Sequence, residues 1–152
     1  MELFDDILIE EYTEWKTANP DNFTWWNFVN MKSNLDMALA FAKFFSPEIL
    51  ITEGYFLLKD KFSKEIFESW KVECNGNKTN VEKMMNLYQL RDFFHINDEN
   101  TENEDEKLKA LGKVLQFFWG MSFKNRYPGK QVTVAVYEED EGELFITVYE
   151  VL

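Results

Sequence analysis

The C-terminal stretch 131–151, QVTVAVYEEDEGELFITVYEV, decides the fold of this chain. It contains two runs of β-branched and aromatic residues, QVTVAVYEE and LFITVYEV, on either side of a turn sequence that includes Gly142. Such runs favour β-strands, and a short connection containing glycine predicts that they pair as an antiparallel hairpin. Each run is apolar on both faces, so we expect the hairpin to lie inside a sheet or beneath helices.

The segment before this hairpin predicts a long helix. Its apolar side chains recur at the spacing of one helical face. They are Leu108, Leu111, Val114, Leu115, Phe118 and Met121. Acidic residues precede the first turn, and Lys124 and Arg126 follow the last one, which agrees with the direction of the helix dipole.

Further upstream, the runs ILIT and YFLL flank Glu53-Gly54 and predict a second hairpin or a bulged strand. Helical patterns precede and follow this hairpin. They cover residues 3–16, 23–29 and 35–45, a helix capped by Ser63, and a helix opened by a Thr79–Glu82 capping box. Residues 35–45 are apolar on nearly every side, so we expect that helix to sit centrally in the fold.

This order of elements is typical of an α+β fold, with about five or six helices packed on a small, mostly antiparallel sheet and a C-terminal β-hairpin. A length of 152 residues with 45% hydrophobic side chains fits a single domain spanning residues 1–152. Residues 97–106 contain six acids and no base, and we interpret them as a solvated acidic loop.

The net charge of −12 is concentrated in three stretches. Residues 1–14 and 97–106 carry six acids each, residues 138–143 carry five, and none of the three contains a base. The rest of the chain has more bases than acids. If the 97–106 and 138–143 segments lie near each other, they form one strongly negative surface, which speeds association with a basic partner.

The same charge argues against non-specific binding to nucleic acid or to an anionic membrane. One cysteine, Cys74, excludes an intramolecular disulfide and fits a reducing compartment. The N-terminus is acidic where a signal peptide needs bases, and the best apolar run, 37–45, is far shorter than a membrane span. We therefore expect a cytoplasmic protein.

The sequence contains no signature of a catalytic, metal or cofactor site. His95 and Cys74 are the only residues of their kinds, and no pattern places them together. No spacing of Cys, His and acids suits zinc. An EF-hand that starts at Asp98 would have Asn103 in place of the turn glycine and Lys109 in place of the bidentate Glu, so it is excluded. The six glycines are too isolated to form a phosphate-binding loop.

Trp25-Trp26 is the most conspicuous aromatic pair. Neighbours on a helix point about 100° apart, so one ring can enter the core while the other stays near the surface. An exposed tryptophan is a natural anchor of a protein interface. The alternative interpretation is that both rings cover the edge of the core.

Two stretches, FFSPEILITEGYFLLKDKFSKEIFESW (44–70) and NVEKMMNLYQLRDFF (80–94), carry a resemblance. They are similar to a loose group of small acidic bacterial cytosolic proteins of unknown function. Some members of that group resemble immunity proteins of contact-dependent or polymorphic toxin systems. Relatives often have histidines near Leu87 and Gln89, which this chain lacks, and no functional residue is carried over from the group.

We therefore expect a non-enzymatic binding protein without a cofactor. The most concrete form is an immunity protein that occludes the active site of a basic partner, a toxin or nuclease. The residues expected to bind that partner are Asp98, Glu99, Glu102, Glu104, Asp105, Glu106, Glu138, Glu139, Asp140, Glu141, Glu143, Trp25 and Trp26.

Three other hypotheses stay open. The first is that the chain is a ligand-binding or enzymatic α+β domain with an aromatic pocket between sheet and helices. The second is that it is an accessory subunit whose hairpin pairs with another chain. A phage-encoded inhibitor of a host defence nuclease would share the physics of the leading hypothesis. The sequence does not indicate the oligomeric state.

Overall fold

The computed structural model describes residues 2–95 and 103–152. Its α-helices are α1 (Glu10–Ala18), α2 (Trp25–Lys32), α3 (Leu35–Phe45), α4 (Lys64–Glu73), α5 (Lys78–Met85) and α6 (Glu104–Arg126), and its strands are β1 (Ile49–Thr52), β2 (Tyr55–Leu58), β3 (Tyr88–Gln89), β4 (Val132–Glu138) and β5 (Leu144–Glu150). Short 3-10 helices η1 (Asp6–Leu8), η2 (Lys59–Lys61) and η3 (Leu90–Phe93) lie between them. The α+β prediction is confirmed, with two small antiparallel sheets where one was expected.

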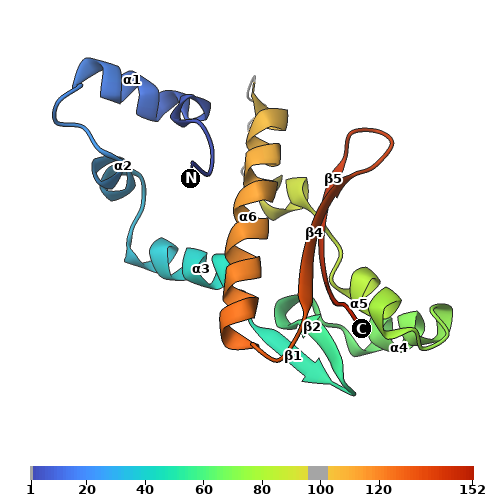
Figure 1. The fold of residues 1–152 in the computed structure, drawn as a ribbon. Helices are drawn as coiled ribbons and strands as arrows, with labels where there is room; N and C mark the ends of the chain where they lie inside the picture. The colour runs from blue at the N-terminus through green and yellow to red at the C-terminus, as the bar shows by residue number, and fades with distance from the viewer. Residues whose placement is uncertain (1, 96–102) are drawn as a thin grey trace.

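The predicted C-terminal hairpin forms, with Val134 opposite Val148 and Ala135 opposite Thr147. The short strand β3, which the sequence analysis missed, pairs with the other edge of β5, so the strand order is β3-β5-β4. β5 is therefore the interior strand, and α6 packs along the hairpin (Figure 1). Gly112 allows the close approach of α6, because a Cβ there would lie only 2.9 Å from Val136 Cγ1.

The second predicted hairpin, β1–β2, turns at Glu53 and Gly54, which have φ values of 51° and 82°. Two positive φ values in a two-residue turn suit the right-handed twist of a hairpin. All four residues of β2 are buried, because the strand runs between two apolar clusters. Phe56 and Leu58 join the main core with α6 and β5, and Tyr55 and Leu57 pack with α4 and α5.

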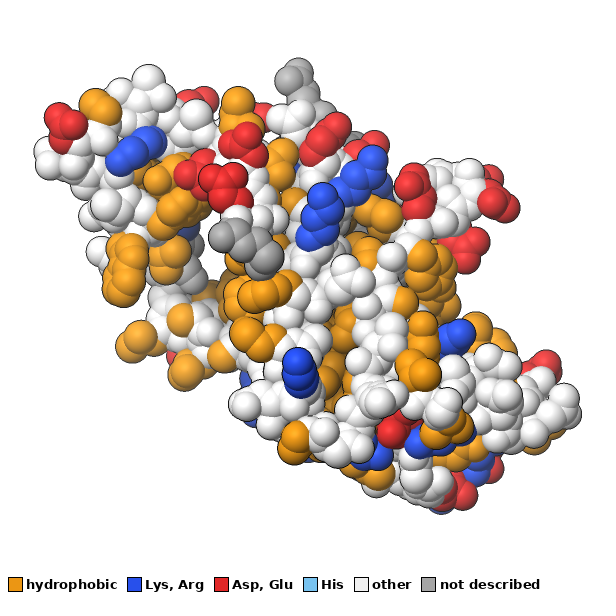
Figure 2. Space-filling view, viewed as in Figure 1, with side chains coloured by type: hydrophobic (Ala, Val, Ile, Leu, Met, Phe, Trp, Pro, Cys, Tyr) orange, Lys and Arg blue, Asp and Glu red, His pale blue; other side chains and the backbone are white. Residues whose placement is uncertain are grey.

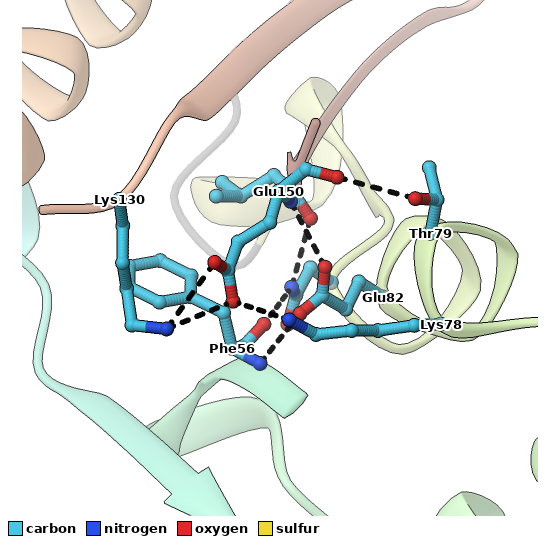
Figure 3. Close-up of polar contacts among 8 residues, drawn as sticks. Phe56, Lys78, Thr79, Glu82, Lys130 and Glu150 are labelled. Atoms are coloured by element: carbon cyan, nitrogen blue, oxygen red, sulfur yellow. Dashed lines mark hydrogen bonds and ion pairs between the residues drawn. The ribbon is translucent and has the colours of Figure 1, made fainter. Parts of the chain in front are cut away.

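Side chains of α5 connect the two sheets, although their strands are not hydrogen-bonded to each other. Glu82 accepts hydrogen bonds from the backbone N–H groups of Phe56 (2.6 Å) and Glu150 (2.9 Å) (Figure 3). One turn later, Asn86 accepts from Leu58 N (2.8 Å) and donates to the carbonyls of Phe56 and Val148 (both 2.9 Å). These two side chains satisfy edge groups of β2 and β5 that would otherwise be buried without partners.

This network corrects the predicted Thr79–Glu82 capping box. Asn77 is the N-cap of α5, and its side chain accepts from Asn80 N. Thr79 donates to the carbonyl of Glu150 (Figure 3), and Glu82 is fully buried. The Ser63 cap of α4 is confirmed, with Ile66 N donating to Ser63 Oγ.

The first three helices form an arm that extends from the rest of the molecule (Figure 1). Its own aromatic cluster holds α1 against α2, and the Trp25 ring stacks on Tyr12 at 3.6 Å between centroids. The helix expected over residues 3–16 is wrong in extent, because it is broken into η1 and α1.

The prediction that residues 35–45 form a central helix is also wrong. None of the residues of α3 is buried. The helix contacts the main core mainly through its last turn, where Phe45 packs on Phe118 and the Phe44 carbonyl accepts from Trp119 Nε1 (2.8 Å). The spacing of apolar residues in a helix indicates that its apolar surface packs against other residues, but it does not indicate which part of the chain those residues belong to.

Candidate protein-binding surface

The first turn of α6 carries one of the predicted acidic groups. The expectation of a loop up to residue 106 is wrong, because α6 begins at Glu104 and places Glu104, Asp105 and Glu106 in its first turn. Carboxylates at this end of a helix are stabilised by the helix dipole. Arg91 of η3 pairs with Glu104 (2.6 Å) and lies 3.7 Å from Asp105, which fixes the start of α6 beside η3.

The β4–β5 turn carries the second acidic group. Its backbone closes on itself, since Glu139 N donates to Glu143 O (2.8 Å) and Gly142 N donates to Glu139 O (2.9 Å). Gly142 has a φ of 80°, which favours glycine. Residues 138–141 are exposed, and within the described chain none of them makes a salt bridge.

Residues of β3 and η3 bring these two groups together. The Gln89 side chain donates a hydrogen bond to the Glu143 carboxylate of the turn. Arg91, two residues later, forms an ion pair with Glu104 at the start of α6. Asp105 lines the same cavity, of about 150 Å³, as three acids of the turn. We call the eight described acids of these two segments the acidic surface: Glu104, Asp105, Glu106, Glu138, Glu139, Asp140, Glu141 and Glu143.

The third acidic stretch, at the N-terminus, reaches the same end of the molecule. Asn103, directly before α6, donates to Glu10 of α1 (3.3 Å). Figure 2 shows acidic side chains along the upper end of the molecule, over α1, the start of α6 and the β4–β5 turn. Lys109 and Arg91 also line the small cavity, so two basic side chains lie among the acids of the acidic surface.

Not every predicted binding residue lies on this surface. Asp98, Glu99 and Glu102 lie outside the described residues. Trp25 and Trp26 are on α2, and α6 stands between that helix and the β4–β5 turn (Figure 1). Trp25 is half-buried, whereas 87% of Trp26 is exposed.

Tyr137 is the aromatic side chain next to the acidic surface, and the sequence analysis overlooked it. It directly precedes Glu138, stacks on Phe145 across the strand pair (5.7 Å between centroids) and remains partly exposed. Partial burial, with a contribution from Glu139, raises its pKa, so the hydroxyl stays protonated and able to donate a hydrogen bond. Its position directly before the acidic stretch 138–143 was the feature of the sequence that could have identified it as part of this surface.

A second hollow lies between α3 and the main core. It has a volume of about 410 Å³, and its aromatic lining comes from Phe44, Tyr88, Phe93 and Trp119. Lys61 lies over the Tyr88 ring, with Nζ 5.3 Å from its centroid, and burial lowers the pKa of this amine.

The other titratable groups have structural roles. His95 Nδ1 bonds the carbonyl of Asp92 (2.8 Å), and Cys74 is a free thiol at the end of α4. Burial raises the pKa of Glu82 against the effect of its two backbone donors. Glu150 pairs with Lys78 (2.8 Å) and Lys130 (3.1 Å) (Figure 3), which together outweigh burial and lower its pKa.

In residues 2–95 and 103–152, no group of three or more His, Cys, Asp or Glu side chains is placed to hold a metal ion. The same residues include no helix with the length and apolar character needed to cross a bilayer. Comparison with protein families, curated proteins and solved structures finds no match to this chain.

Proposed function

We propose that this chain is a non-enzymatic binding protein that inhibits a basic protein partner, most concretely an immunity protein that neutralises a nuclease-like toxin. The observation that carries the proposal is the convergence of the β4–β5 turn and the first turn of α6. Segments more than thirty residues apart in sequence line one cavity, joined through Gln89 and Arg91. The active site of a nuclease is positively charged, because it binds phosphates, and is therefore a complementary target.

The charges of the turn are available to such a partner. Residues 138–141 are exposed and make no salt bridge with any described residue, so binding a partner's Lys or Arg there breaks no ion pair in the part of the chain that the structure describes. A surface of one sign raises association rates by factors of about 10 to 10³ at low salt. Tyr137, at the edge of these charges, supplies an aromatic contact of the kind that anchors interfaces.

We also propose a cytoplasmic location, where a free thiol such as Cys74 stays reduced. The net charge disfavours nucleic acid and anionic membranes as partners. An inhibitor of a host defence nuclease, encoded by a phage, would use the same surface in the same way.

A neutralised turn tests the proposal. The variant carries Glu138→Gln, Glu139→Gln, Asp140→Asn and Glu141→Gln. The control removes four exposed acids elsewhere: Asp21→Asn, Glu65→Gln, Glu68→Gln and Glu73→Gln. The wild-type protein is expected to capture a basic protein from lysate of the source cell at low salt and to inhibit its activity. The turn variant should associate with that protein at least about tenfold more slowly, and the control should match wild type.

The turn is closed by backbone hydrogen bonds, so the turn variant should keep the wild-type Tm. Equal association rates for wild type and the turn variant at low salt would contradict the role of this surface. Capture that is as strong in about 0.5 M salt as at low salt would also contradict it, because salt screens exposed charges.

The hollow beside α3 supports a second candidate function, the binding of a small ligand. Its volume and aromatic lining are those of a ligand pocket, and Lys61 makes no salt bridge with any described residue. An aromatic carboxylate would fit both features. We expect indole or phenyl carboxylates to raise the Tm of wild type and of a Lys64→Met control but not of Lys61→Met. No shift with any of these compounds would exclude this candidate.

A further inference from the structure

Helix α3 has two apolar stripes, and only one of them packs on the rest of the described chain. Phe41, Phe44 and Phe45 form the first stripe, which packs on itself and on η3 and α6. Leu35, Ala38, Leu39 and Ala42 form the second, with spacings of three and four residues, and all four are exposed. The exposed fractions of Leu35 and Leu39 are 82% and 69%.

The second stripe has the form of a helix-packing face. Apolar residues at i, i+3, i+4 and i+7 are what a helix buries against a neighbour, and a helix that is apolar all round is normally covered on every side. Ala38 and Ala42 lie one turn apart on this stripe, so a second helix can approach to about 8 Å between axes.

The uncovered surface extends onto α2. Trp26, Val29 and Met31 are exposed there. Figure 2 shows apolar side chains gathered on this part of the arm. With Leu35 and Leu39, these are five large apolar side chains that are each more than half exposed. Contiguous exposed apolar patches larger than a few hundred Å² mark interaction sites in soluble proteins.

We propose that a second copy of this chain covers this face, with the two α3 helices packed antiparallel about a two-fold axis. The charges beside the stripe favour this occupant. Asp36 lies in the first turn of α3 and Lys43 in the last, seven residues apart on the same flank of the stripe. Lys43 pairs with Glu48 of its own chain (2.6 Å), but this ion pair is exposed, so the ammonium group can also contact a second carboxylate. In an antiparallel pair, Asp36 of each copy comes opposite Lys43 of the other, whereas a parallel pair would place like charges together.

The rest of the charge distribution agrees with this arrangement. In Figure 1, α3 lies beside the C-terminal half of α6, whereas the acidic surface is at the start of α6 and at the β4–β5 turn, so two copies can meet through α3 without bringing these surfaces together. The proposal uses none of the residues of the acidic surface and does not depend on the proposed function.

Sedimentation velocity of the full chain from about 1 to 200 μM tests the proposal. Wild type should be a dimer in the upper part of this range, with a Tm that rises with concentration. Leu35→Lys with Leu39→Lys should be monomeric throughout, with unchanged helical content, since both side chains are exposed. The control, Ile66→Lys with Val72→Lys, changes two exposed apolar residues of α4 and should remain dimeric.

Cross-linking tests whether α3 forms the contact. In a Cys74→Ser background, Leu39→Cys lies near the centre of the stripe, so a short bismaleimide should join two copies, while Val72→Cys should give monomer. A monomeric wild type at 200 μM would overturn the proposal. So would a dimer that survives both lysine substitutions, or equal cross-linking from positions 39 and 72. The neutralised turn variant should dimerise as wild type does, which separates this inference from the proposed function.

Discussion

Asn86→Ala is expected to lower the free energy of unfolding by about 3–5 kcal/mol, because it leaves three buried backbone groups without partners. Those groups are Leu58 N, Phe56 O and Val148 O. The side chain is almost completely buried, so water cannot replace it without opening the contact between the sheets. Single domains have a total stability of about 5–15 kcal/mol, so this variant should be marginally folded.

Asn80→Ala is the matched control for this prediction. It makes the same chemical change on the same helix, but Asn80 is exposed, and its effect should stay below about 0.5 kcal/mol. Urea unfolding followed by circular dichroism measures both variants. A loss below about 1 kcal/mol for Asn86→Ala would show that the two sheets do not depend on this amide.

Glu82→Gln is expected to cost about 2–4 kcal/mol, although the two side chains have nearly the same shape. Each oxygen of Glu82 accepts from a different backbone donor, Oε2 from Phe56 N and Oε1 from Glu150 N. Glutamine has only one oxygen, so its NH₂ group would face one of these N–H donors. The backbone N–H of either Phe56 or Glu150 would then lose its acceptor and face the NH₂ group of glutamine, which is a donor.

The effect of pH adds a second test of Glu82. Burial raises its pKa in the folded state, so the folded protein releases this proton at a higher pH than the unfolded chain does. The contribution of this group to stability is therefore largest below its ordinary pKa and declines as the pH rises through the raised value. Glutamine does not titrate, so Glu82→Gln should cost more at about pH 4 than at about pH 7. Glu65→Gln, at an exposed position, is the control, and the opposite trend for Glu82→Gln would contradict this account.

A dimer through α3 would carry two acidic surfaces on one particle. The two surfaces would lie at the ends away from the α3 contact, where each can engage its own basic partner (Figure 1). In that case the affinity for a single partner would be unchanged, whereas binding to an immobilised partner would be strengthened by the second contact. The monomeric Leu35→Lys with Leu39→Lys variant should therefore keep the affinity for a single partner and lose the stronger binding to the immobilised partner.

The elements that depend on local sequence were predicted well. The hairpin at Glu53-Gly54, the strands on either side of Gly142 and the long helix α6 all form as expected. Turn residues with positive φ and apolar periodicity over many residues act within a short segment, so they can be interpreted without knowledge of the rest of the chain.

The arrangement of the candidate binding surface could be predicted only in part. The acids of the turn and the first turn of α6 were identified as charged segments, but their proximity was not, because it depends on Gln89 and Arg91 in elements too short to be recognised. Tyr137 was not considered because it stands at the end of an apolar strand run, and the packing of the whole chain decides whether its ring stays partly exposed beside the acids. One interpretation of Trp25-Trp26 left one of the two rings near the surface. That ring is Trp26, and it lies on another part of the molecule.

The sequence by itself determined the types of the elements, the positions of the tight turns and the uneven distribution of charge, because these follow from interactions between residues close together in the chain. Only the tertiary structure decided that Glu82 and Asn86 join two sheets, that two acidic segments converge, and that α3 is left uncovered. Each of these depends on which distant segment supplies a partner. The residue pattern indicates that a group requires a hydrogen bond, an opposite charge or an apolar neighbour. The packing of the whole chain determines which residue supplies it.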